Sequence, residues 1–198
     1  SKGEGLGNKF LANIRNTHAI IHVLRCFDNG NITHVDGSID PVRDKGIIDT
    51  ELQLKDLETI ENRLAKTQKQ AVVGGDKQAK SAVEILLQYK AVLEQGLSAR
   101  TVELEKEDRK LVADLNLLTD KPVLYVCNVD EKSAVTGNEH TRAVEAAIAD
   151  ERAEMLIVAA ATEADIAELD EYEERQMFLE EIGLKESGVA RLIKAAYK

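Results

Sequence analysis

The amino-acid sequence predicts an α/β protein whose parallel sheet is interrupted by an antiparallel helical hairpin. Three short apolar runs, at residues 19–27, 122–127 and 155–159, have the nearly continuous hydrophobic character of strands buried on both faces. Helical patterns separate and follow the second and third runs, and this alternation indicates right-handed βαβ units. Between the first and second runs, two amphipathic patterns flank a Gly-Gly-Asp break at residues 74–76, which is typical of an αα-hairpin.

Residues 1–45 are predicted to form the first part of the α/β domain. A glycine-rich loop at residues 1–8 leads into a short amphipathic helix, for which Asn8 is a candidate N-cap. The strand at residues 19–27 follows, and a polar stretch rich in Asn, Asp and Gly extends from there to about Asp44.

Residues 46–100 are predicted to form a coiled-coil hairpin inserted into the α/β domain. Apolar side chains recur at steps of three, four or seven residues between Ile47 and Val73, and a second helical pattern ends near Gly96. Each apolar stripe is narrow, as in a two-stranded coiled coil whose remaining faces lie in water.

Residues 101–198 are predicted to form the second part of the α/β domain. Its two strands are the runs at 122–127 and 155–159. The helical patterns of this part cover residues 105–118, 139–153, 170–182 and 187–197.

The net charge of −10 is distributed unevenly along the 198 residues. The whole acidic excess lies in residues 101–198, which carry twelve Lys and Arg against twenty-three Asp and Glu. An acidic surface disfavours sequence-independent binding to nucleic acid, because such binding depends on neutralising phosphates. The stretch 66–80 is a local exception, and it is either a small basic tip that contacts RNA or a solvated turn. Its cations are Lys66, Lys69, Lys77 and Lys80.

The sequence also indicates a soluble protein of the cytoplasm. No apolar run reaches the roughly 18 residues that a membrane-spanning helix needs, and no secretory signal precedes the first helix, so no membrane partner is expected. Cys26 and Cys127 each lie within an apolar run, and we expect them to be buried, reduced thiols.

Two of the predicted strands end in segments suited to binding a ligand. The strand 122–127 leads directly into Asn128-Val129-Asp130-Glu131, and the strand 155–159 leads into Ala159-Ala160-Ala161. Ligands of parallel α/β sheets bind at the carboxyl ends of the strands. The small side chains of the second segment do not block access to its backbone N–H groups. The alternative is that Asn128 terminates a strand and Glu131 is simply solvated.

The first of these segments resembles the base-recognition element of P-loop NTPases, whose usual form is N-K-x-D. Further motifs resemble one branch of the Obg-related NTPases, the YchF or Obg-like ATPase family. They are Gly-Glu-Gly-Leu-Gly-Asn-Lys-Phe (3–10), His-Val-Leu-Arg-Cys-Phe (22–27), His-Val-Asp-Gly (34–37), Asp-Pro (40–41), Asn-Val-Asp-Glu (128–131) and Glu-Ala-Asp-Ile-Ala-Glu-Leu (163–169).

The resemblance implies a partial P-loop NTPase fold, G-domain-like, in a cytoplasmic ATPase that also handles GTP in some members and associates with ribosomes. Carried over by position, Asn128, Val129 and Glu131 contact the base of ATP or GTP, and the backbone from Ala159 to Ala161 closes over it. Glutamate at position 131 extends the carboxylate by one methylene relative to aspartate. A site whose donors and acceptors are mismatched to a ligand rejects it strongly, so we expect weakened preference for guanine, with adenine tolerated or favoured.

The sequence departs from the family in its phosphate-binding part. It contains no G-x-x-x-x-G-K-[ST], the loop that holds the phosphates, and it lacks the segments that supply the Mg²⁺ ligands implied by the family. The C-terminal TGS domain of the family is also missing, so the sequence resembles an internal fragment. No catalytic or metal-binding residue is therefore predicted, and we expect no ATPase activity from these residues alone. The alternative hypothesis is a non-catalytic interaction module whose hairpin docks on a ribosomal or protein partner.

Overall fold

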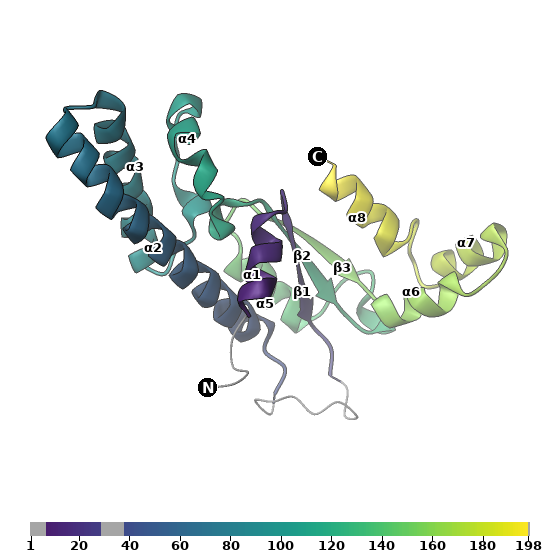
Figure 1. The fold of residues 1–198 in the computed structure, drawn as a ribbon. Helices are drawn as coiled ribbons and strands as arrows, with labels where there is room; N and C mark the ends of the chain where they lie inside the picture. The colour runs from purple at the N-terminus through teal and green to yellow at the C-terminus, as the bar shows by residue number, and fades with distance from the viewer. Residues whose placement is uncertain (1–6, 29–37, 198) are drawn as a thin grey trace. The chain divides into compact units, whose positions relative to one another are not determined.

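The computed structural model describes residues 7–28 and 38–197, and the chain divides into two compact units (Figure 1). The units are residues 1–20 with 46–122, and residues 21–45 with 123–198. The glycine-rich opening before Gly7 and the His-Val-Asp-Gly motif (34–37) lie outside the described residues. Within the described ranges, no helix has the length and apolar character needed to cross a membrane.

The α/β class and the parallel sheet are confirmed. Strands β1 (Ile20–Arg25), β2 (Val123–Asn128) and β3 (Glu154–Val158) lie in the order β1-β2-β3. The parallel register of β2 and β3 pairs residues 124 to 128 with residues 154 to 158. The carboxyl ends of these two strands therefore lie at the same edge of the sheet.

One face of the sheet forms a buried hydrophobic core with helix α5 (Glu139–Ala147). Side chains of β1, β2 and α5 are buried together with residues just beyond the strand ends. The core residues are Leu24, Cys26, Tyr125, Cys127, Val129, Ala134, Val144, Ile148 and Ala159. The two cysteines are free thiols with no exposed surface, in agreement with the sequence analysis.

The other face of β1 is open, which contradicts the expectation of a strand buried on both sides. Ile21 is 49% exposed and Val23 is 62% exposed, whereas four residues of β2 are buried in succession. Strand β1 lies at the edge of the sheet, and no described residue covers these two side chains fully.

The chain after β3 is helical. Helices α7 (Tyr172–Glu181) and α8 (Gly188–Ala196) match the predicted patterns. Helix α6 (Ala160–Ala167) is a further helix, which none of the predicted helical patterns covers. Helix α5, before β3, ends at Ala147, six residues before the predicted end of its pattern.

The other unit is mainly helical. Its helices are α1 (Asn8–Arg15), most of α2 (Pro41–Gly74), α3 (Lys77–Glu94) and α4 (Lys106–Val112), with short 3-10 turns at Ala99–Thr101, Ala113–Leu115 and Leu118–Asp120. The pattern at 105–118 is therefore not one helix. Helical structure stops before Asn116, whose φ of 47° lies in the left-handed region. Asn8 is the first residue of α1, and Gly7 occupies the N-cap without a side-chain hydrogen bond.

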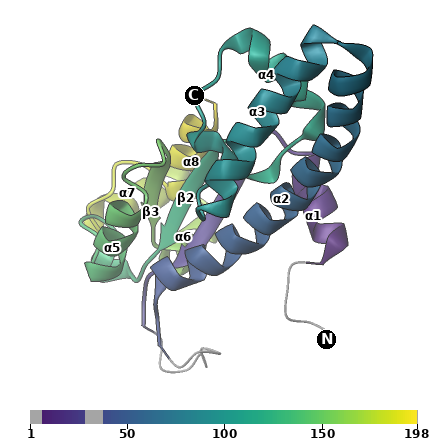
Figure 2. The ribbon, with the colours of Figure 1, turned by 90° about the vertical axis from the view of Figure 1, so that its left-hand side faces the viewer.

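Helices α2 and α3 lie on either side of residues 74–76 and pack against each other (Figure 2). Gly75 has a φ of 61°, a conformation that glycine adopts without strain, and the Asp76 side chain caps α3 by accepting from the Gln78 amide at 2.9 Å. The sequence predicted that the remaining faces of the hairpin lie in water. This prediction is wrong, because α4 and the segment around it share the core of the hairpin. That core contains Ile60, Leu64, Ile85, Leu86, Tyr89, Leu93, Ala99, Val102, Val112, Leu115 and Leu117.

A buried carboxylate ties α2 to the segment that precedes β2. Asp56 has no exposed surface, and its oxygens accept from the Leu118 amide at 2.8 Å and the Thr119 amide at 2.8 Å. The Thr119 hydroxyl donates to the same carboxylate at 2.7 Å. Burial raises the pKa of Asp56, while these hydrogen bonds oppose the shift.

We expect Asp56→Ala to lower the free energy of unfolding by about 3 kcal/mol, because two buried amides and a hydroxyl lose their acceptor. Urea unfolding followed by circular dichroism measures the change. Glu58→Ala, on an exposed carboxylate of the same helix, is the matched control and should change stability by less than about 0.5 kcal/mol. Equal stability of the two variants would contradict the structural role of Asp56.

Candidate functional site

The segments predicted to form a site meet at the carboxyl ends of β2 and β3. The Asn128 side-chain oxygen accepts a hydrogen bond from the backbone amide of Ala160 at 3.1 Å. The pairing of the strands continues past their ends, since the Val129 amide donates to the Val158 carbonyl at 2.9 Å. Two segments that are 32 residues apart in sequence are thus joined by a side-chain bond and a backbone bond.

The alanine segment is the start of a helix. Ala159 is buried at the N-cap of α6, while Ala160 and Ala161 are exposed in its first turn. The first N–H groups of a helix have no partner within the helix, and the helix dipole adds positive character there. One of these N–H groups is used by Asn128, and the small side chains leave the others accessible to an acceptor on a ligand.

The segment after β2 places its side chains in different surroundings. Val129 is 3% exposed and its side chain belongs to the core of the unit, so the side chain is not available to a ligand. Glu131 begins a short 3-10 turn, Glu131–Ser133, and is exposed. Its carboxylate has neither a hydrogen bond nor an ion pair within the described part of the chain, and it is free to accept from a bound molecule.

The end of β1 adds contacts that the sequence analysis missed. The Cys26 amide donates to the Asn128 carbonyl at 2.7 Å, and the Cys26 carbonyl accepts from the Asn138 side chain at 2.7 Å. Asn138 also caps α5, since its oxygen accepts from the Thr141 amide at 3.0 Å. Asn138 therefore fixes the end of β1 beside Asn128. The N-cap pattern before α5 was a sequence signal for it, but its partner is 112 residues away.

Arg25 and Phe27 form a second group at this edge. The guanidinium carbon of Arg25 lies 4.9 Å from the centre of the Phe27 ring, within the range of a cation–π contact. The Nε and Nη2 atoms of Arg25 are buried and donate to no acceptor among the residues that the structure describes.

A cavity of about 600 Å³ opens beside Ala160, on the side of the sheet opposite the α5 core. Its wall is mostly apolar and includes the first turn of α6. The lining residues are Val126, Val158, Ala160, Glu163, Ala164, Ile166, Ala167, Tyr172, Arg175, Gln176, Leu179, Ser187, Gly188, Val189 and Leu192.

Glu163 fixes α8 against this wall. Its carboxylate accepts from the Gly188 amide at 2.9 and 2.7 Å and lies 3.8 Å from Arg191. A Cβ at position 188 would lie 2.7 Å from a Val158 methyl carbon. Because α8 approaches β3 this closely, only glycine fits at position 188.

The described residues at this edge of the sheet offer no set of ligands for a metal ion. Within residues 7–28 and 38–197, no three His, Cys, Asp or Glu side chains converge on a point where a cation would bind. The described residues do not fit the Mg²⁺ implied by the resemblance, and no chemical step is assigned to a metal at this site.

Comparisons with known proteins give one consistent family. No protein-family model matches the chain. The chain is 50% identical over 199 residues to the ribosome-binding ATPase YchF of Bacillus subtilis (strain 168), and 46% identical over 198 residues to that of Escherichia coli O157:H7. Each alignment covers 100% of this chain and 54% of the relative, so the chain spans about half the length of the curated relatives it matches.

A solved structure gives the same result. The fold matches that of the Schizosaccharomyces pombe YchF GTPase with a TM-score of 0.86 at 30% sequence identity, over 100% of this chain and 54% of that one. The resemblance to the YchF family, an Obg-like branch of the P-loop NTPases, is thereby confirmed over the whole of this chain.

Proposed function

We propose that this chain supplies the purine-recognition part of a ribosome-associated ATPase of the cytoplasm. The observation that carries the proposal is the bond from the Ala160 amide to Asn128, which joins the two strand-end segments expected to hold the base. The names of the related proteins, a ribosome-binding ATPase in bacteria and a GTPase in fission yeast, support nucleotide hydrolysis and ribosome association.

Each residue has a distinct part in the proposed recognition. Asn128 holds the first turn of α6 in place, so that the backbone from Ala159 to Ala161 closes over the ring. Val129 contributes its backbone, because its side chain is buried in the core. Glu131 offers an exposed carboxylate that accepts hydrogen bonds from an amino group on the edge of the base.

Phosphate binding and hydrolysis are assigned to no residue of this chain. Catalysis of phosphoryl transfer rests on positioning and charge stabilisation around the phosphates, and the sequence contains no phosphate-binding loop. ATP is the proposed ligand, with GTP as the weaker alternative. Any Mg²⁺ would be held together with the phosphates rather than at the base site.

We expect Glu131→Ala to weaken ATP binding by about tenfold to a hundredfold, because a hydrogen bond to a charged group contributes about 1.5–3 kcal/mol. Isothermal titration of ATP and GTP into the intact natural protein measures both affinities. Glu131→Asp shortens the side chain by one methylene and should shift the preference toward GTP. Glu173→Ala, on an exposed face of α7, is the matched control. Parental affinity of Glu131→Ala would remove Glu131 from the site.

We expect Asn128→Ala to weaken ATP and GTP binding to the same extent, by about threefold to tenfold, because the lost bond positions backbone and reads neither base. The same titrations measure this effect, and the amide exchange rate of Ala160 should rise in the variant. A change in the ATP-to-GTP ratio would show instead that Asn128 discriminates between bases.

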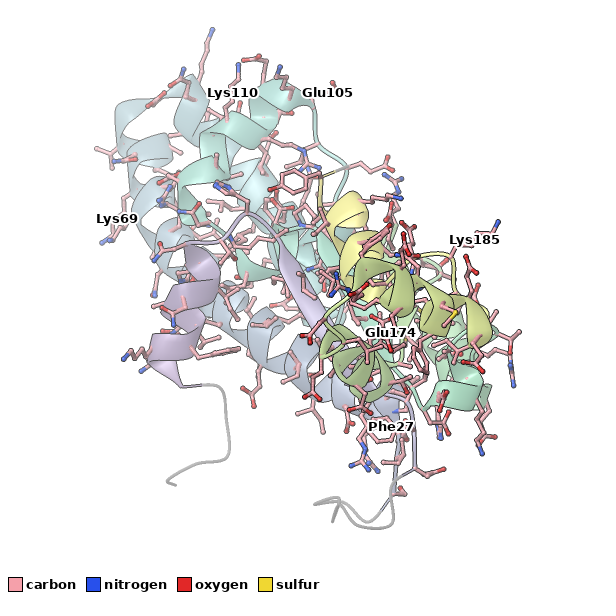
Figure 3. All side chains as sticks on the ribbon, turned by 90° about the vertical axis from the view of Figure 1, so that its right-hand side faces the viewer. Phe27, Lys69, Glu105, Lys110, Glu174 and Lys185 are labelled. Atoms are coloured by element: carbon pink, nitrogen blue, oxygen red, sulfur yellow. The ribbon has the colours of Figure 1, made fainter. Side chains whose placement is uncertain are left out.

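The hairpin supports a second candidate function, docking on the ribosome without catalysis. Lys66, Lys69, Lys77 and Lys80 are all exposed, and Lys69 is labelled on the helical hairpin in Figure 3. Val72 is 83% exposed and Val73 is 88% exposed between them. Exposed valines flanked by lysines combine apolar contact with attraction to phosphates, which suits a ribosomal surface.

We expect replacement of these four lysines by glutamate to weaken ribosome binding by at least about tenfold and to reduce its salt dependence. Co-sedimentation with ribosomes at several salt concentrations, with and without ATP, measures both. The control makes the same change at four exposed lysines outside the hairpin, Lys106, Lys110, Lys132 and Lys185. Equal losses in both variants would show that net charge, rather than the hairpin, governs binding.

A further inference from the structure

A second cavity, of about 430 Å³, lies entirely within the helical unit and shares no residue with the base site. It is formed by the end of α1 and the loop after it, by α3, by α4, and by the segment that leads to β2. Its lining residues are Arg15, Asn16, Thr17, His18, Tyr89, Arg109, Val112, Ala113, Asn116, Leu117, Asp120, Lys121 and Pro122.

The wall of this cavity is positively charged in a chain whose net charge is −10. It carries Arg15, Arg109 and Lys121 against a single carboxylate, Asp120. Arg15 and Lys121 form no ion pair with any described residue.

The donors of these two cations are directed to uncharged oxygens. Arg15 donates to the Leu115 carbonyl at 3.4 Å and to the Thr59 hydroxyl at 3.2 Å. Lys121 donates to the carbonyls of Arg15 and Thr17. These bonds fix the positions of the cations. Arg15 also interacts electrostatically with the buried carboxylate of Asp56, whereas Lys121 has no charged partner among the described residues.

Two further polar groups of the wall, the Tyr89 hydroxyl and the Oδ1 atom of Asp120, make no hydrogen bond with the described residues. Tyr89 is 1% exposed, and its hydroxyl makes no hydrogen bond with them. The Oδ1 atom of Asp120 is buried and accepts no hydrogen bond, although it forms an ion pair with Arg109 at 3.6 Å. Arg109 also donates to the Val102 carbonyl at 3.4 Å. Buried polar atoms in folded proteins are almost always satisfied, so the Oδ1 atom of Asp120 favours a hydrogen-bond donor within the cavity.

The raised pKa of Tyr89 keeps its hydroxyl protonated, so that it can act as a hydrogen-bond donor. Burial, reinforced by the negative charge of Asp120 and opposed by Arg109, raises the pKa of Tyr89 to about 12. The hydroxyl therefore stays neutral at physiological pH and can donate a hydrogen bond into the cavity.

We propose that this cavity binds a small phosphate group, either inorganic phosphate or the phosphate of a small monoester. Arg109, Lys121 and Tyr89 supply donors for its oxygens. Asp120 accepts the hydrogen bond of a protonated phosphate oxygen, which gives the buried Oδ1 atom a hydrogen-bond donor. A carboxylate in a cationic wall selects an oxyanion that retains a proton, since a fully deprotonated oxyanion would be repelled.

Nuclear magnetic resonance of the full chain, titrated with phosphate at constant ionic strength, tests the proposal. Saturable shifts are expected at the amides of His18 and Asn116, without shifts at Ala160, which reports on the base site. Sulfate carries no proton at neutral pH and should bind at least about tenfold more weakly than phosphate. Methyl phosphate alongside inorganic phosphate distinguishes the monoester from the free anion.

Substitutions make the test specific. Arg109→Gln should weaken phosphate binding at least about tenfold, and Tyr89→Phe by about threefold to tenfold. Arg63 pairs with Asp114 outside the cavity, so Arg63→Gln should leave phosphate affinity unchanged. Asp120→Asn should raise sulfate affinity until it equals or exceeds that for phosphate.

Absence of a saturable shift at His18 and Asn116 would overturn the proposal and indicate a cavity filled by water alone. Equal affinity of Arg109→Gln and the parent would overturn it as well. Equal binding of sulfate and phosphate by the parent would remove the role given to Asp120. Because Arg109 is largely exposed, its variant is expected to fold, and circular dichroism verifies this.

Discussion

The register of β2 against β3 is the constraint on which the candidate base site depends. Pairing Asn128 with Val158 places both strand ends at one level, so that the Asn128 side chain reaches the first amide of α6. Side chains alternate between the faces of a sheet, and a slip of one residue would carry Asn128 to the opposite face. The register is fixed by burial, because Tyr125 and Cys127 must both point into the α5 core.

The sequence predicted the strands better than their surroundings. Strand β2 is a continuous apolar run and is buried on both faces, as the pattern indicated. Strand β1 has the same composition, but Ile21 and Val23 are exposed, because burial depends on neighbours that a local pattern does not identify. The helical pattern at 105–118 failed for a local reason, since Asn116 adopts a left-handed conformation that interrupts it.

The candidate site was predictable where local chemistry determined it. Asn128 stood out as a polar residue at the end of a buried run, and small residues after β3 indicated close backbone approach. The same small residues are compatible with a helix, so the first turn of α6 was missed. Arg25 and Asn138 were missed because their significance lies in contacts across the sheet, which spacing along the chain does not reveal.

The ligands proposed for the base site and for the helical-unit cavity are both anions, and the chain is acidic, so recognition must rely on groups at contact distance. Backbone N–H groups at the start of α6 and the cations of the helical-unit cavity act over a few ångströms. The acidic excess of residues 101–198 acts over longer distances, and at physiological ionic strength charges more than about 8 Å apart are largely screened. Short-range donors therefore prevail over the overall charge. The acidic remainder of the surface then suppresses nonspecific contacts with nucleic acid and confines phosphate binding to the few places where donors converge.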